Sequence, residues 1–173
     1  MNTSLYDRDF YRWLEVTAAQ LRAQQFQQVD WENLLEEIES LGRSEKNALA
    51  SYLMRLCEHL LKIQYWESER ANCLRGWKVE IFEFRRQIQE ALATSPSLKP
   101  FLQGIFVRQY QNGRKRFLLA SDLSAAGIPP VPAFTLAQAL DPDWLPDQPG
   151  DDSKNPTVNP AMVENATEAP PNS

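Results

Sequence analysis

The stretch DWENLLEEIESLGRSEKNALASYLMRLCEHLLKIQYW, residues 30–66, decides the fold of this chain. At 100° per residue its apolar side chains fall on one stripe of a helix, and the stripe keeps its phase across Gly42. The members of the stripe are Trp31, Leu34, Leu35, Ile38, Leu41, Leu49, Tyr52, Leu53, Leu56, Leu60 and Ile63. Because a glycine costs a helix interior only about 1 kcal/mol, the pattern predicts one continuous helix about 55 Å long. A helix of this length needs other helices packed along it.

Residues 7–25 predict a first helix, with Phe10, Trp13 and Leu14 on its apolar side. The connection from this helix to Asp30, the predicted N-cap of the central helix, is short. Since short connections join antiparallel neighbours, we expect the first helix to lie along the first half of the central one.

Two more helices are predicted after the central one. The polar stretch 67–76 interrupts the apolar pattern, which restarts as a helix over 77–92 that runs back along the second half of the central helix. A fourth helix is predicted over 96–123, because a serine and a proline stand at its start. The pair Asn112-Gly113 predicts a kink or an interruption in it.

The last part of the chain changes composition. Residues 127–146 contain too many prolines for continuous secondary structure but are rich in large apolar side chains, so they predict a strap across the bundle, with one capped turn at 135–140. Residues 147–173 contain many Asp, Asn and Pro and no aromatic residue, which is typical of a disordered tail. We therefore expect an all-α domain over 1–146, an antiparallel bundle of about four helices on one long central helix, followed by the tail 147–173.

The composition of the chain predicts the cellular compartment in which it acts. The net charge is −5, there are two cysteines without metal-ligand spacing, and no run approaches 18 uninterrupted apolar residues. The N-terminus lacks the basic and apolar regions of a signal peptide. These features predict a cytoplasmic, reduced protein with no membrane segment, and no motif predicts a cofactor.

Acidic residues and the single histidine are the candidates for catalysis or metal binding. Glu32, Glu36 and Glu39 lie on one flank of the predicted helix and could hold a divalent cation if further ligands converged there. His59, with Glu36 and Glu37, is the candidate acid–base set. The alternatives are a solvated acidic flank and a structural histidine at a helix seam, hydrogen-bonded to a carboxylate of the next helix.

Basic residues are concentrated in the middle of the chain. The candidate anion-binding residues are Arg85, Arg86, Arg114, Lys115 and Arg116. Together with nearby aromatic residues they could contact phosphates and stack bases. The pI near 5 is low for a dedicated nucleic-acid-binding protein, so this is a secondary hypothesis.

Several phrases of the sequence resemble a known bacterial family. The matching stretches are YDRDFYRWL (6–14), VDWENLLEEIESLGRSEKNAL (29–49), HLLKIQYW (59–66), GWKVEIFEFRRQI (76–88), SPSLK (95–99) and DPDWLP (141–146). They resemble the family called domain of unknown function 29, which implies an all-helical bundle and no established activity. The stretches 71–77 and 121–127 depart from the pattern of that family.

These features favour a protein–protein interaction module that self-associates or binds a helical partner. The first alternative is an enzyme, either one that depends on a metal or one that uses His59 and carboxylates, and whether the chain is an enzyme stays open. The second alternative is a regulator that binds nucleic acid through residues 70–116.

Overall fold

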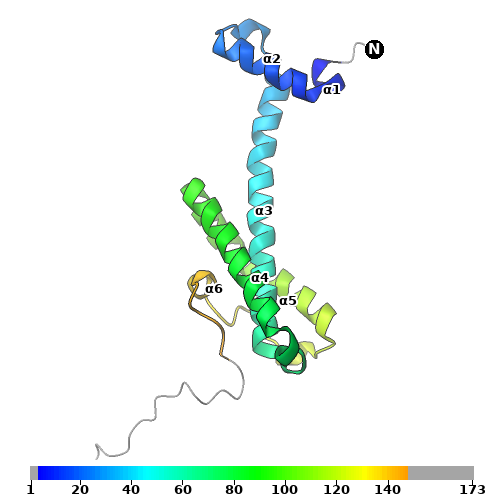
Figure 1. The fold of residues 1–173 in the computed structure, drawn as a ribbon, viewed down its shortest axis with the longest axis vertical. Coiled ribbons are helices and arrows are strands. Elements are labelled where there is room, and N and C mark those ends of the chain that lie inside the picture. The colour runs from blue at the N-terminus through cyan, green and yellow to red at the C-terminus, as the bar shows by residue number, and fades with distance from the viewer. Residues whose placement is uncertain (1–3, 148–173) are drawn as a thin grey trace, which may run out of the picture.

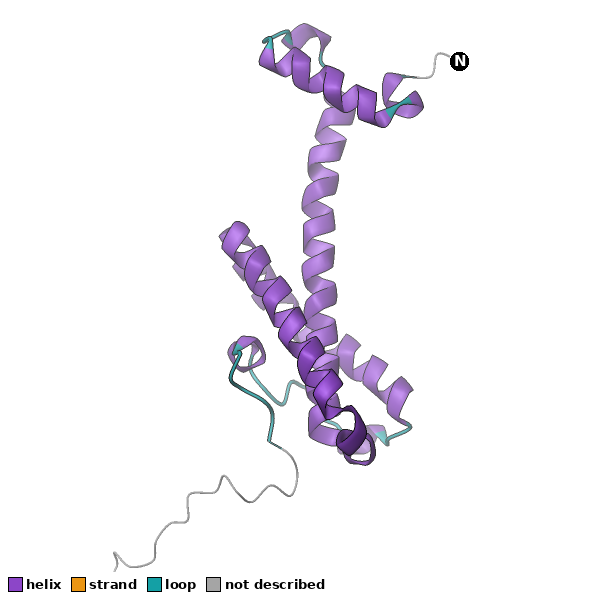
Figure 2. Cartoon of the chain, viewed as in Figure 1, coloured by secondary structure: helices purple, strands orange, loops and turns teal. Residues whose placement is uncertain are grey.

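The computed structural model describes residues 4–147, and in this range it contains helices and loops but no strand (Figure 2). The helices are α1 (Leu5–Arg8), α2 (Phe10–Arg22), α3 (Trp31–Tyr65), α4 (Glu67–Thr94), α5 (Lys99–Ser121) and α6 (Leu136–Leu140). Short 3-10 turns connect them: η1 (Phe26–Gln28), η2 (Pro96–Leu98) and η3 (Ala125–Gly127). The predicted fold, an all-α bundle on one long helix, is confirmed. Apart from Asp147, the predicted tail lies outside the described residues.

The central helix α3 is continuous over 35 residues, as the unbroken stripe predicts. The Asp30 carboxylate caps its start by accepting a hydrogen bond from the backbone N–H of Asn33. Gly42 lies inside the helix, and a Cβ there would meet nothing within 4 Å. Figure 1 shows α3 as a long shaft, with α4 and α5 beside its second half.

The chain reverses between α3 and α4 over a single residue. The prediction of a helix start at Trp77 is wrong, because α4 begins ten residues earlier, at Glu67. Arg70 donates hydrogen bonds to the carbonyl of Ile63 and to that of the next residue. These are carbonyls that the end of α3 leaves without helical partners, so the polar stretch is helical and also caps α3.

A close crossing of backbones joins α5 to α3. A Cβ on Gly113 would lie 2.7 Å from the carbonyl oxygen of Met54 and 2.9 Å from the backbone nitrogen of Glu58. The predicted kink at Asn112-Gly113 is absent, because α5 runs unbroken to Ser121. Gly113 therefore allows close helix packing and does not bend its own helix.

The strap packs on the bundle as predicted. Ile128 is 2% exposed and Phe134 4%, and α6 is capped by Thr135 and Gln138 in a reciprocal capping box. The Tyr110 hydroxyl donates to the carbonyl of Pro129, which holds the strap against α5. None of the helices in the described range is long and apolar enough to cross a membrane.

The N-terminal segment is arranged differently from the prediction. Instead of one helix antiparallel to α3, the chain forms α1 and α2, and α2 lies across the start of α3 (Figure 1). The chain is redirected after α2, where Gln24 has a left-handed φ of 56°. Trp13 is buried, but Phe10 and Leu14 of the predicted apolar side are 43% and 41% exposed. The first half of α3 therefore receives no antiparallel cover from α2.

Candidate functional site

A buried polar cluster lies where α3 meets α4 and α5. Glu58 on α3 is only 4% exposed, and its carboxylate accepts hydrogen bonds from Arg116 Nε at 2.9 Å and pairs with Lys62 Nζ at 3.0 Å. Burial alone would raise the pKa of Glu58, but the hydrogen bonds from Arg116 and Lys62 lower it below its ordinary value. Glu58 is thus a buried, charged carboxylate with two cationic partners.

His59 occupies the seam between α3 and α4. It is 3% exposed, and its Nδ1 lies 2.8 Å from the carbonyl oxygen of Arg55, so this nitrogen donates. Its Nε2 contacts the carboxylate of Glu80 on α4. Burial lowers the pKa of His59, and the charge of Lys62 lowers it further, although the Arg55 carbonyl and the carboxylates of Glu80 and Glu58 favour the charged ring. Both ring nitrogens have protein partners, which suits a structural role and leaves neither nitrogen open to a substrate.

The acidic candidates lie on the exposed first half of α3. Glu32, Glu36 and Glu39 are all exposed, and Glu39 pairs with Arg43 at 3.4 Å. Glu37 instead accepts a hydrogen bond from the hydroxyl of Tyr6, and this bond raises the pKa of Tyr6 to about 12. Among residues 4–147 no group of three His, Cys, Asp or Glu side chains is placed to hold a metal.

Distance separates Glu36 and Glu37 from His59. Because α3 is continuous, Glu36 and His59 are 23 residues apart on one helix, which is about 35 Å. One copy of the chain cannot bring these candidate acid–base residues to the same substrate. Cys57, beside the cluster, is also poorly suited to act as a nucleophile, because burial raises the pKa of its thiol to about 12.

Most of the candidate anion-binding arginines bind groups of the chain itself. Arg85 donates to the strap carbonyls of Ala139, Pro142 and Trp144, at 2.8, 3.3 and 2.8 Å. The other contacts are as follows: Arg86 pairs with Glu83 and Glu90, Arg114 donates to the carbonyls of Ala125 and Ile128, Arg116 donates to Glu58, and Lys115 is exposed. The sequence brings these cations together in the chain, but the structure spreads them over internal contacts.

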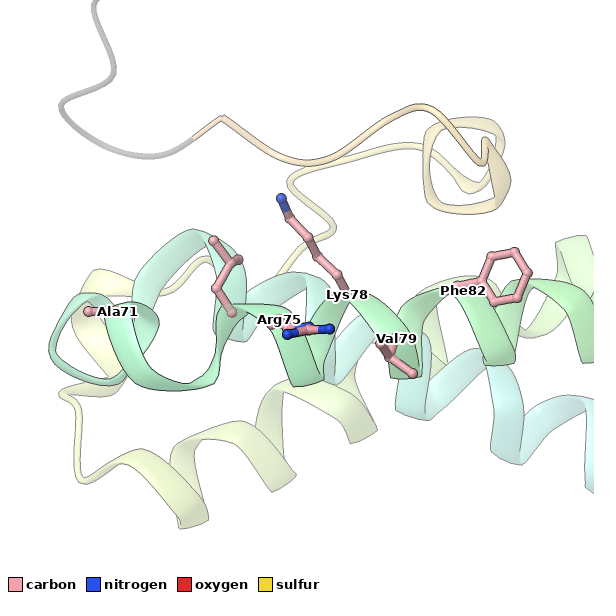
Figure 3. A pocket seen from close by; sticks show the side chains of 6 residues that line it. Ala71, Arg75, Lys78, Val79 and Phe82 are labelled. Carbon is pink, nitrogen blue, oxygen red and sulfur yellow. The ribbon is translucent and has the colours of Figure 1, made fainter.

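A shallow hollow lies on the outer side of α4 (Figure 3). Its lining side chains are Ala71, Leu74, Arg75, Lys78, Val79 and Phe82, and its volume is about 580 Å³. Phe82 is 64% exposed and Val79 62%. The lining contains no carboxylate, histidine, thiol or hydroxyl group beside its two cations, so it offers a binding surface but no acid–base pair.

An uncovered apolar face lies at the N-terminal end of α3. We call Phe26, Trp31, Leu35, Ile38 and Leu41 the N-terminal apolar face; their exposed fractions are 50%, 46%, 56%, 56% and 70%. The last four lie on the α3 stripe, and the Trp31 ring nitrogen donates to the Phe26 carbonyl at 3.0 Å. Sequence reasoning identified the stripe but assigned all of it to the core.

The described residues thus form an all-helical domain whose buried polar groups serve its own packing and whose central helix is half covered. A family model described as "Domain of unknown function DUF29" matches residues 5–145, and the chain belongs to this family. The expected family is therefore confirmed, and it brings no activity with it. No curated protein and no solved structure is similar enough to match the chain.

Proposed function

We propose that this protein is a protein–protein interaction module that self-associates through the N-terminal apolar face. The observation that carries the proposal is the difference between the two halves of α3. In the second half the stripe is buried, with Leu49, Leu53 and Leu56 at most 1% exposed. In the first half Ile38 and Leu41 continue the stripe but are more than half exposed. Contiguous exposed apolar surface of this kind marks interaction sites on soluble proteins.

The size of the face suits such an interface. An aromatic side chain has about 150–250 Å² of surface, and a leucine or isoleucine lies near the lower end of that range, so five side chains that are about half exposed present on the order of 500 Å². Two copies that cover each other's face would bury roughly 1,000 Å² in total, which is near the lower bound for a specific interface. The enzyme and nucleic-acid hypotheses have less support, because His59 and four of the five basic candidates are occupied by internal contacts.

Light scattering coupled to size exclusion tests the proposal on the full chain. The wild type should have the mass of an oligomer, and Ile38→Glu should have the mass of a monomer with unchanged helical circular dichroism. Ile38 is 56% exposed within one copy, so the charge disturbs the free chain little.

Phe82→Glu is the matched control, because Phe82 is similarly exposed but lies in the hollow on α4. It should leave the oligomer intact. A wild type that remains monomeric at every concentration would show that the chain does not self-associate, and loss of the oligomer in Phe82→Glu alone would move the interface to α4.

A further inference from the structure

We infer that the partner of the N-terminal apolar face is the same face of a second copy, with the two α3 helices antiparallel and centred near Ile38. This inference rests on the proposed function and adds the geometry of the interface. It follows from three features of α3: the extent of its uncovered part, an open glycine in the stripe, and the order of charges along the helix.

The uncovered part of the stripe has defined limits. At one end α2 lies across the start of α3 (Figure 1), and the Tyr6 hydroxyl donates to Glu37, which lies on a flank of the helix beside the stripe. At the other end Ser95 donates to Glu45 at 2.9 Å, and Lys46 lies 5.6 Å from the centre of the Phe101 ring. A partner helix therefore has about 14 residues, 31–44, to lie against, which is about 21 Å. The midpoint of this range is near Ile38.

Gly42 lies within this uncovered stripe. A Cβ on Gly42 would meet nothing within 4 Å, whereas a Cβ on Gly113 would clash with the backbone of α3. Gly113 shows how this protein uses a helical glycine for close helix packing. In an antiparallel pair centred on Ile38, Gly42 of each copy lies level with Leu34 of the other, and Leu41 lies level with Leu35. A glycine opposite a leucine provides the hole into which the larger side chain packs.

Charge favours the antiparallel direction. Residues 30–39 contain five carboxylates and no basic residue, whereas residues 40–46 contain Arg43, Glu45 and Lys46, with a net charge of +1. Parallel helices would place the two acidic segments side by side. Antiparallel helices place residues 30–36 of each copy level with residues 40–46 of the other, where the exposed Arg43 lies, and this arrangement suits complementary association.

Spin-label distances test the direction of the helices. Glu32→Cys and Glu39→Cys, each in a Cys73→Ser background, place labels on the same flank of α3, while Cys57 is buried and stays unlabelled. At 1.5 Å per residue, the axial offset between equivalent labels in an antiparallel dimer is about 18 Å at position 32 and about 3 Å at position 39. A parallel dimer would give the same short distance at both positions.

Gly42→Ala tests the close packing independently. In one copy the methyl group enters open space and favours the helix, so the thermal midpoint of the free chain should not fall. In the antiparallel pair it overpacks the hole opposite Leu34, which should raise the dimer dissociation constant by at least about fivefold. Gly76→Ala on α4 is the control, since a Cβ there also meets open space, and the dissociation constant should not change.

The outcomes separate this inference from the proposed function. A dimer with a short distance at both label positions, or one that tolerates Gly42→Ala, keeps the self-association and overturns the antiparallel packing. A wild type that remains monomeric overturns both. The inference holds if the two labels of the dimer are far apart at position 32 and close together at position 39. It also requires that Gly42→Ala weakens the dimer and Gly76→Ala does not.

Discussion

The imidazole of His59 on α3 contacts the carboxylate of Glu80 on α4, although His59 is buried and the Glu80 side chain is 52% exposed. The pair therefore joins a desolvated ring to a carboxylate that water still reaches. Burial disfavours the charged ring, and the half-exposed Glu80 is too well hydrated to compensate fully. The balance predicts a histidine that resists protonation in the folded state.

We predict that His59 makes the protein less stable in mild acid. Its folded pKa lies below the ordinary value of 6.5, so as the pH falls below 6.5 the unfolded chain binds a proton that the folded chain resists. The free energy of unfolding should therefore fall between pH 6.5 and the carboxylate range. His59→Gln should stay within about 1 kcal/mol of the wild type at pH 8 and lose this step. Urea unfolding at several pH values measures both, and a wild type that gains stability on acidification would contradict the assigned direction.

Glu58 should account for a second, more acidic step. Its pKa is lowered below 4.5, so its contribution to stability is complete above pH 4.5 and is lost as the pH falls through the folded pKa. At neutral pH, Glu58→Gln leaves Lys62 and Arg116 without their buried carboxylate and should cost about 1–3 kcal/mol. Glu90→Gln is a suitable control, because that carboxylate is 60% exposed in a surface pair. Equal unfolding curves for the two variants would show that the buried pairs add nothing.

The crossing of α5 over α3 predicts a strong effect of one methyl group. Gly113→Ala would put a carbon 2.7 Å from the Met54 carbonyl oxygen, and the atoms it meets are backbone atoms that cannot rotate away. We expect a loss of about 1–3 kcal/mol, because the two helices must move apart to accept the methyl group. Gly104→Ala in the same helix meets open space and should stabilise it by up to about 1 kcal/mol. In thermal unfolding, a lower melting temperature for Gly113→Ala and a higher one for Gly104→Ala would support the close crossing.

Periodicity in the sequence predicted the parts of the fold that depend on one helix at a time. The continuity of α3 across Gly42, the return of α4 and the packing of the strap all follow from where apolar residues recur. The early start of α4 could not be predicted from apolar periodicity, because its first turns are polar. They are stabilised by a contact between two helices, in which Arg70 caps the end of α3. The role of Gly113 was also hidden, since a close crossing involves two helices and the sequence shows each helix separately.

The candidate site shows the same limit. The position of His59 beside a carboxylate of the next helix followed from antiparallel packing of the central helix. The N-terminal apolar face did not, because periodicity identifies the apolar side of a helix but not what covers it. Leu35 and Leu53 lie at the same angle of the stripe, yet one is 56% exposed and the other is fully buried. The difference comes from where α2, α4 and α5 lie, which is a tertiary property.

Arg85 should be essential for the attachment of the strap. Its guanidinium donates to three strap carbonyls at once, those of Ala139, Pro142 and Trp144. Among the amino acids, only arginine has such a planar set of hydrogen-bond donors. Arg85→Lys keeps the charge but cannot reach all three carbonyls, so we expect a loss of about 1–3 kcal/mol. Hydrogen exchange should accelerate over residues 128–146 and stay unchanged in α3. Arg86→Lys is the control next in sequence, because Arg86 pairs with the half-exposed Glu83 and the exposed Glu90 on its own helix. Exchange in the strap that is equally slow in both variants would show that apolar contacts of Phe134 and Ile128 hold it without Arg85.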